Sequence, residues 1–91
     1  GIERVEDHAR DLSAAIDAGL RRMGRTVISP EERPGRSGNT CFLDDDAAGV
    51  TRRLGERGVL VWGEYGRVRV SGHLYNGMDD VERFLEALAD L

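Results

Sequence analysis

The sequence predicts an α+β fold in which three helices cover one face of a small, mostly antiparallel sheet of about four strands. Helix-like and strand-like patterns follow one another along the 91 residues in the order α-β-β-α-β-β-α. The last two strand-like runs are joined by only four residues, which is typical of a hairpin. The other links are also short, and a two-layer α+β sandwich accommodates this order best.

Residues 2–22 have the 3.6-residue period of an amphipathic helix. The apolar positions of this period are Ile2, Val5, Ala9, Leu12, Ile16 and Leu20. Charged residues occupy the opposite side, and Gly24 follows where a glycine commonly ends a helix. Residues 25–29 and 39–43 are strand-like runs, while residues 30–38 contain both prolines and are typical of a loop.

Three aspartates at 44–46 precede a second predicted helix at 46–57, which Gly58 ends. Its apolar positions are Ala47, Val50 and Leu54. Carboxylates at a helix start complement the exposed N–H groups and the positive end of the helix dipole. A cation site is the alternative, but it needs more converging oxygen ligands than this run supplies.

The C-terminal part predicts a hairpin followed by a helix. Residues 59–62 are apolar and β-prone, residues 63–66 have a glycine at each end, and residues 67–71 alternate strictly. The final helix is predicted at 77–90, with Asn76 as its N-cap in a capping-box-like start. Its apolar face consists of Val81, Phe84, Leu85 and Leu88.

Composition limits the classes of function. The formal net charge of −4 disfavours a nucleic-acid-binding protein. No run is long and apolar enough to cross a bilayer, and the charged N-terminal residues do not resemble a signal peptide. The single cysteine, Cys41, permits no internal disulfide, which favours a reducing, cytoplasmic location. Its place in a strand next to Phe42 predicts a buried structural thiol.

Several catalytic and metal motifs are missing from the sequence. All 13 basic residues are arginine, so these 91 residues contain no lysine for a Schiff base. His8 and His73 lack cysteine partners at zinc spacing, and we expect His8 on the exposed side of its helix. Ser37 and Ser71 have no nearby base in the sequence, and the glycine-rich loop lacks the Gly-Lys-Ser/Thr of a P-loop.

The strand predicted at 67–71 carries the most informative pattern. Side chains alternate between the two faces of a strand. If the two valines of this run face the helices, Arg67 and Arg69 share the opposite, uncovered face. A guanidinium matches a carboxylate through two parallel hydrogen bonds. The two arginines are therefore either solvated surface residues or part of an anion-binding site.

The C-terminal residues contain three short motifs in order: Arg69-Val70-Ser71, Tyr75-Asn76 and Asp79-Asp80-Val81. Together they resemble the closing signature of class V aminotransferases and cysteine desulfurases. In that family an Arg-x-Ser strand is followed, four residues after the serine, by Tyr-Asn and then by a last helix that begins with paired acids. Residues 36–42 and 50–61 are similar to the strand and the helix–strand unit that precede this signature.

The resemblance implies that residues 1–91 are the C-terminal small domain of a larger pyridoxal-phosphate (PLP) enzyme of fold type I. The implied chemistry is aminotransfer, C–S or C–Se lysis, or kynureninase-like cleavage of an amino acid. Arg69 would bind the substrate carboxylate, while Arg67 and His73 are candidates to line the site; His73 is alternatively a turn residue. Tyr75 and Asn76 would fix the turn between the last strand and helix.

The resemblance also implies what lies elsewhere. The family holds PLP on a large N-terminal domain, so no cofactor, metal or catalytic residue is expected on this chain itself. The expected partners are that large domain, the amino-acid substrate and a second subunit of a homodimer, with no nucleic acid or membrane. The link at 63–66 lacks the cysteine that desulfurases carry between their last two strands. That departure disfavours a desulfurase that works through a cysteine persulfide.

A stand-alone α+β module that binds an amino acid or dimerises is the alternative. It fits the composition equally well, but it does not account for the run from Arg69 to Asp80. If the chain is a small domain without its partner, the uncovered sheet face should make the isolated chain self-associate.

Overall fold

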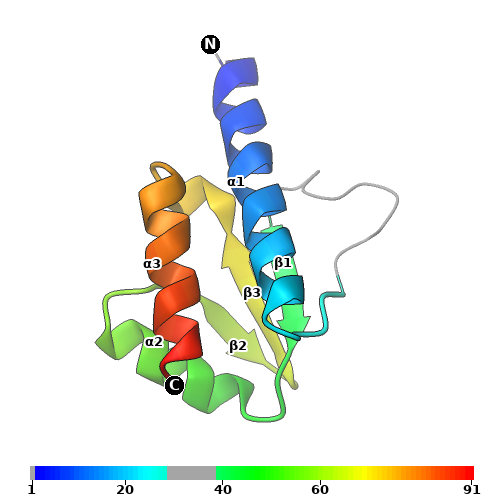
Figure 1. The fold of residues 1–91 in the computed structure, drawn as a ribbon, viewed down its shortest axis with the longest axis vertical. Helices are drawn as coiled ribbons and strands as arrows, with labels where there is room; N and C mark the ends of the chain where they lie inside the picture. Colours follow the sequence, from blue (N-terminus) through cyan, green and yellow to red (C-terminus); the bar gives the residue numbers. More distant parts are fainter. Residues whose placement is uncertain (1, 29–38) are drawn as a thin grey trace.

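The computed structural model describes residues 2–28 and 39–91 and has the predicted α+β architecture (Figure 1). The elements are α1 Ile2–Arg22, β1 Asn39–Leu43, α2 Ala47–Glu56, β2 Trp62–Glu64, β3 Arg67–Ser71 and α3 Met78–Ala89. The three described strands form one antiparallel sheet in the order β1-β3-β2, and a 3-10 turn at Gly72–Leu74 follows β3.

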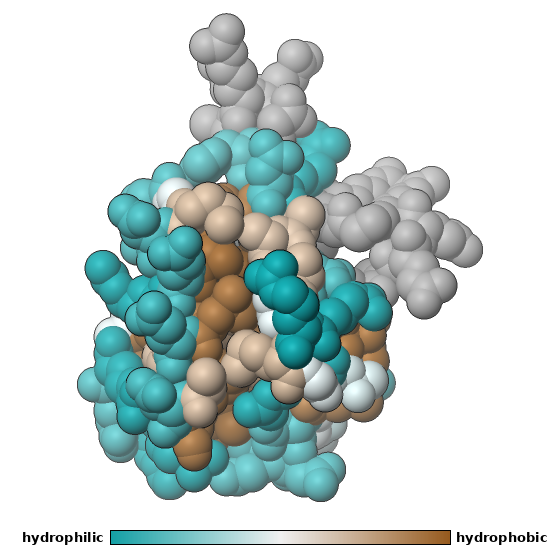
Figure 2. Space-filling model, viewed as in Figure 1, coloured by the Kyte–Doolittle hydropathy of each residue, from teal (hydrophilic) through white to brown (hydrophobic). Residues whose placement is uncertain are grey.

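All three helices pack on the same face of the sheet (Figure 1). α1 lies over β1 and beside α3, and α2 lies over β2. Gly19 leaves room for Leu85 between α1 and α3, because a Cβ added there would force the side chain of Leu85 to move. Figure 2 shows hydrophobic residues in the strip between these two helices, flanked by hydrophilic residues on their outer surfaces. None of the described helices combines the length and the apolar character of a bilayer span.

The core lies between the helices and the covered face of the sheet. Phe42 of β1 and Val68 and Val70 of β3 are wholly buried there. The apolar stripes predicted for the helices supply the opposite wall, through Leu12, Ile16, Leu20, Val50, Leu54, Val81, Phe84 and Leu88. One polar pair lies in this layer, because the hydroxyls of Ser13 and Thr40 form a buried hydrogen bond of 2.7 Å between α1 and β1.

Gly24 and Gly58 end α1 and α2, as predicted. Both have a positive φ, 84° and 78°, which glycine adopts without the steric cost that a Cβ brings. Directly after Gly24, the N–H of Arg25 donates to the carbonyl oxygen of Leu20 at 2.9 Å. An equivalent hydrogen bond follows Gly58, so both helices close with a Schellman motif.

The strand predicted at 25–29 is wrong over its described part. Only Val27 is paired, through an isolated antiparallel bridge to Phe42. The N–H of Arg25 belongs to the cap of α1, and two backbone hydrogen bonds of 2.9 Å flank the bridge, from the N–H of Ile28 to Cys41 and from the N–H of Leu43 to Thr26. Within the described residues the sheet therefore has three strands instead of about four. Ser29 and the loop predicted at 30–38 lie outside the described residues.

The predicted hairpin is confirmed, but its turn is shorter than the predicted link at 63–66. Its first strand, β2, lies at Trp62–Glu64 and not at 59–62. The turn consists of Tyr65 and Gly66, whose φ values of 52° and 75° are those of a two-residue type I′ connection. Gly63 is a strand residue and not part of the turn. A Cβ added at Gly63 would collide with Thr51 and with the backbone of α2, so this glycine allows α2 to approach β2.

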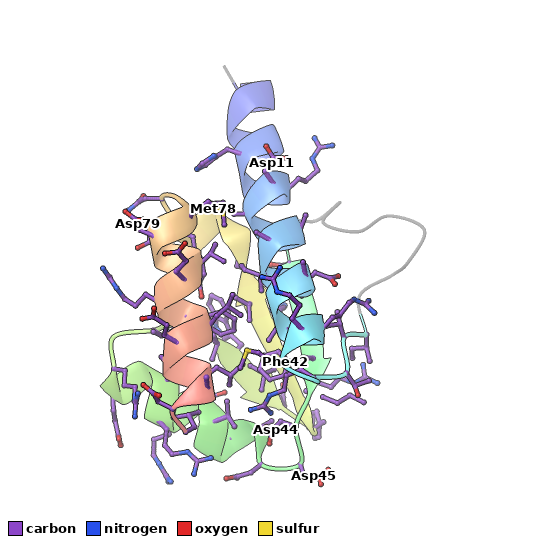
Figure 3. All side chains as sticks on the ribbon, viewed as in Figure 1. Asp11, Phe42, Asp44, Asp45, Met78 and Asp79 are labelled. Atoms are coloured by element: carbon purple, nitrogen blue, oxygen red, sulfur yellow. The ribbon has the colours of Figure 1, made fainter. Side chains whose placement is uncertain are left out.

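The predicted N-cap of α3 is wrong. Gly77 occupies the N-cap position with extended backbone and no side-chain cap hydrogen bond. The carboxylate of Asp80 instead accepts a hydrogen bond of 2.7 Å from the backbone N–H of Asn76. Figure 3 shows Met78 and Asp79 at the start of this helix, where acidic side chains complement the helix dipole.

Candidate functional site

The sheet face that the described helices leave uncovered carries Arg67 and Arg69. Burial along β3 alternates as predicted, because Val68 and Val70 are wholly buried while both arginines are exposed. Two cationic side chains therefore project from the central strand of the sheet, on the side opposite the helices. The placement of Arg69 on this face is confirmed; its binding role stays a prediction.

Arg69 belongs to a row of side chains that crosses the sheet. The pairing register places Cys41 of β1 on one side of it and Trp62 of β2 on the other. The guanidinium carbon of Arg69 lies 5.3 Å from the centroid of the Trp62 ring, within cation–π range. A guanidinium that lies flat over a ring would keep the N–H donors at its edge available for an anion.

No described carboxylate forms an ion pair with Arg69. Other arginines do form such pairs: Arg25 with Asp44 at 2.6 Å, Arg53 with Asp46 at 3.4 Å and Arg57 with Asp90 at 3.4 Å. An exposed guanidinium with an aromatic support and without an acidic partner is suited to an external carboxylate.

Arg67 has different neighbours on the same face. It lies between Leu43 of β1 and Glu64 of β2 in the pairing register. Arg67, like Arg69, forms no ion pair with a described carboxylate, but the charge of Glu64 directly across the strand partly offsets that of its guanidinium. Arg67 is therefore less suited than Arg69 to bind an anionic ligand.

Sequence reasoning missed Trp62 as a neighbour of Arg69. Val59 and Val61 are buried while Leu60 and Trp62 are exposed, so the alternation that placed Arg69 also extends into this run. This alternation, followed from Val59 to Trp62, places Trp62 on the uncovered face. The sequence hides this signal because Gly63 resembles a turn residue.

The two histidines have separate places. The backbone of His73 lies in the 3-10 turn after β3, and its side chain lies outside the described part of the chain. Its predicted place beside the site stays a prediction. His8 is exposed, as expected, and its Nε2 lies 2.9 Å from the carbonyl oxygen of Asn76. That contact ties α1 to the loop before α3.

Cys41 is not buried, contrary to the prediction. Its side chain is partly exposed on the uncovered face, beside Arg69 in the register. The reason is the alternation of β1, since Thr40 and Phe42 take the two positions that face the helices.

The acidic run before α2 serves the helix start, as predicted. Asp46 is the N-cap and accepts a hydrogen bond of 3.3 Å from the N–H of Gly49. Asp44 pairs with Arg25 and also accepts a 2.8 Å hydrogen bond from the N–H of Asp46. Figure 3 shows Asp44 and Asp45 at the turn between β1 and α2. The part of the chain that the structure describes contains no group of three potential metal ligands.

Tyr75 packs inside the turn that leads to α3. Its ring centroid lies 6.2 Å from that of Phe84, and its buried hydroxyl has no hydrogen-bond partner among the described residues. Burial, and secondarily the charge of Asp80, raise the pKa of this hydroxyl well above its ordinary value. Tyr75 also lines a pocket of about 280 Å³ between α3 and the loop that follows α2, where Asp80 and Arg83 contribute polar groups.

The residues of this chain do not fit the anchoring of PLP. A Schiff base needs a lysine amine, and the sequence contains none. The uncovered face instead presents Arg69, whose donor set suits a carboxylate. These 91 residues therefore contain no lysine to which that cofactor could attach.

Comparisons with known proteins give a likeness of fold. No protein-family model and no curated protein sequence matches the chain significantly. The solved structure of a "putative aminotransferase" from Burkholderia pseudomallei resembles it with a TM-score of 0.70 at 24% sequence identity. The likeness covers 92% of this chain and 25% of that one, so the chain spans about a quarter of that protein's length. At this identity the likeness establishes a shared fold with one part of the larger protein.

Proposed function

We propose that this chain is the C-terminal small domain of a PLP-dependent enzyme of the class V aminotransferase type, and that Arg69 binds the substrate carboxylate. The observation that carries the proposal is the position of Arg69. It projects from the sheet face opposite the helices, it stacks on Trp62, and no described carboxylate forms an ion pair with it.

Two further observations support the proposal. The run from Arg69 through Tyr75 and Asn76 to Asp80 resembles the closing signature of that family. The fold is also similar to that of about a quarter of the "putative aminotransferase" from Burkholderia pseudomallei. The sequence pattern and the fold are separate lines of support, because the pattern occupies only the last part of the chain.

The proposed roles of this chain and of the rest of the enzyme follow from the residues that the chain contains. When bound to the rest of the enzyme, PLP would supply the electron sink for reactions at the amino-acid α-carbon. This chain would bind the carboxylate and orient the amino acid, which lowers the entropic part of the barrier. A guanidinium held at a fixed position is suited to that task, since its paired donors set both the position and the plane of a carboxylate.

The exposed apolar side chains of the uncovered face support the proposal that another domain packs against it. This face carries Leu43 and Trp62 as exposed apolar side chains beside the two arginines. We propose that a large N-terminal domain covers this face, with the amino acid bound between the two domains. We further propose a homodimer in the cytoplasm, the location that a single cysteine favours.

The proposed reaction is aminotransfer or C–S or C–Se lysis. The two-residue turn between β2 and β3 contains no cysteine, and Cys41 lies instead in β1. A persulfide carried on the last hairpin, as in cysteine desulfurases, is therefore disfavoured.

The test uses the complete gene product that carries these residues, with Arg69→Ala and Arg69→Lys. Turnover is screened with the standard L-amino acids, and the best of them is compared with its α-carboxamide. Arg69→Ala should raise KM for the acid about 100-fold and remove the preference for acid over amide, because the amide has no charge to pair. Arg69→Lys should restore part of the affinity.

Unchanged KM and an unchanged acid-to-amide ratio in Arg69→Ala would rule out the carboxylate role. Cofactor absorbance is recorded for each variant, since loss of bound PLP would identify a structural effect. The gene upstream of Gly1 provides an independent test. It should encode a large domain with a Schiff-base lysine, and an open reading frame that begins near Gly1 would contradict the proposal.

A stand-alone module is distinguished by its assembly. If the uncovered face binds a second copy, the 91-residue chain should sediment as a stable dimer whose dissociation requires no other protein. A small domain without its partner should self-associate weakly and become monomeric when the large domain is co-expressed. Sedimentation velocity of the two preparations separates these outcomes.

A further inference from the structure

The indole of Trp62 and the guanidinium of Arg69 face one another across β2 and β3. We propose that Trp62 is a positioning residue for Arg69: it holds the guanidinium in the plane from which the edge donors reach a carboxylate. This inference rests on the function proposed above and adds a residue that the closing sequence signature does not contain.

An unsupported arginine side chain on an open sheet face samples many rotamers. Binding a carboxylate then requires that most of this freedom be lost, which weakens the affinity. An aromatic ring 5.3 Å from the guanidinium carbon restricts the plane of the group before the ligand arrives. The restriction leaves the edge N–H groups unused, whereas an acidic neighbour would occupy them.

The position of Trp62 is itself fixed by the hairpin. The two-residue turn at Tyr65 and Gly66 sets the register, which pairs Trp62 with Arg69. The adjacent Gly63 lies against Thr51 of α2, so β2 has no room to shift towards the helices. The stack is therefore built into the packing of the sheet and does not depend on a flexible segment.

On its other side, towards β1, Arg69 has no aromatic neighbour in the pairing register. The partner of Arg69 on β1 is Cys41, a small side chain without an aromatic face. Arg67 again provides the comparison, because its two cross-strand partners are Leu43 and Glu64. In the described part of this face, the arginine that lacks an acidic neighbour is the one that stacks on a tryptophan.

The test compares Trp62→Leu, Trp62→Phe and Leu43→Ala in the complete gene product. Leu43 is the matched control, since it is 43% exposed, as is Trp62, and also lies beside an arginine on this face. With the best of the standard L-amino acids, Trp62→Leu should raise KM about three- to tenfold and leave kcat within about twofold. It should also lower the acid-to-amide ratio. Trp62→Phe should restore most of the loss, and Leu43→Ala should keep the acid-to-amide ratio of the parent even if it weakens the contact with the large domain.

The stack has a spectroscopic signature that does not depend on activity. Trp62 is the sole tryptophan of the 91 residues. Arg69→Ala should therefore change the tryptophan emission of this chain, while Arg67→Ala should leave it unchanged. Equal emission from both variants and the parent would contradict the stack.

The outcomes distinguish this inference from the function on which it rests. If Arg69→Ala loses the acid-to-amide preference but Trp62→Leu keeps the parent KM, the positioning role is overturned and the carboxylate role stands. If Trp62→Leu reduces kcat/KM equally for acid and amide, Trp62 acts structurally and the positioning role is again overturned. If Arg69→Ala keeps the preference, both proposals fail together.

Discussion

The two faces of the sheet are built from alternate residues of the same strands, but they differ in chemistry. The covered face presents Phe42, Val68 and Val70 to the helices, and all three are wholly buried. The opposite face presents Trp62, Arg67 and Arg69, and all three are exposed. The first set is what the hydrophobic effect requires for folding. The second set contributes little to stability, so it is the part of the sheet that is free to serve binding.

The largest expected effect is a charge placed on the covered face. Val70→Asp buries a carboxylate among apolar side chains, which should cost about 5 kcal/mol or more and abolish cooperative unfolding. Arg69→Asp, one residue earlier on the same strand, should change the free energy of unfolding by less than about 1 kcal/mol. Thermal unfolding followed by circular dichroism checks both. A folded Val70→Asp variant would contradict the assignment of the faces.

A smaller effect is expected where α2 meets β2. Gly63→Ala introduces a Cβ that collides with Thr51 and with the backbone of α2, and we expect a loss of about 1–3 kcal/mol. Gly55→Ala is the matched control, because a Cβ at this position of α2 meets open space. It should stabilise the chain by about 0.5–1 kcal/mol. Denaturant titrations decide this, and equal behaviour of the two alanine variants would refute the packing account.

The smallest effect concerns Tyr75 and the pH. The folded state raises the pKa of its hydroxyl above the ordinary value of about 10, first through burial and then through Asp80. The unfolded chain therefore loses this proton first, so stability present at neutral pH should decline as the pH rises above about 10.

Tyr75→Phe is the corresponding test. It removes a hydroxyl that has no partner among the described residues, so stability at neutral pH should change by less than about 1 kcal/mol. The alkaline decline should become shallower in this variant. Urea titrations between about pH 8 and about pH 11 measure it. An equally steep decline in both proteins would assign the pH dependence to other groups.

The covered face could be predicted from the sequence because it follows from local periodicity. The stripe of α1 and the alternation of Val68 and Val70 each lie within one element. The alternation is present as expected, and so is the stripe from Ala9 to Leu20, while the side chains of Ile2 and Val5 lie outside the described part of the chain. Gly24 and Gly58 were predictable for the same reason, since a helix end is a local event.

The errors have two sources. Gly63 resembles a turn residue until α2 is packed against it, which is a tertiary contact. The N-cap error is local, because Asp80 accepts a hydrogen bond from the N–H of Asn76 and Gly77 takes the N-cap position. The stack of Trp62 on Arg69 depends on that same hairpin register, so it was not visible from the sequence. The alternation placed Arg69 correctly, but its neighbours came from the structure.

The most direct test of the central claim compares the two arginines on the uncovered face. In the complete gene product, the ratio of kcat/KM for the best standard L-amino acid to that for its α-carboxamide is measured for Arg69→Ala and Arg67→Ala. The account predicts that this ratio falls towards one in Arg69→Ala and stays within about threefold of the parent in Arg67→Ala. An unchanged ratio in Arg69→Ala, or an equal fall in both variants, would contradict it.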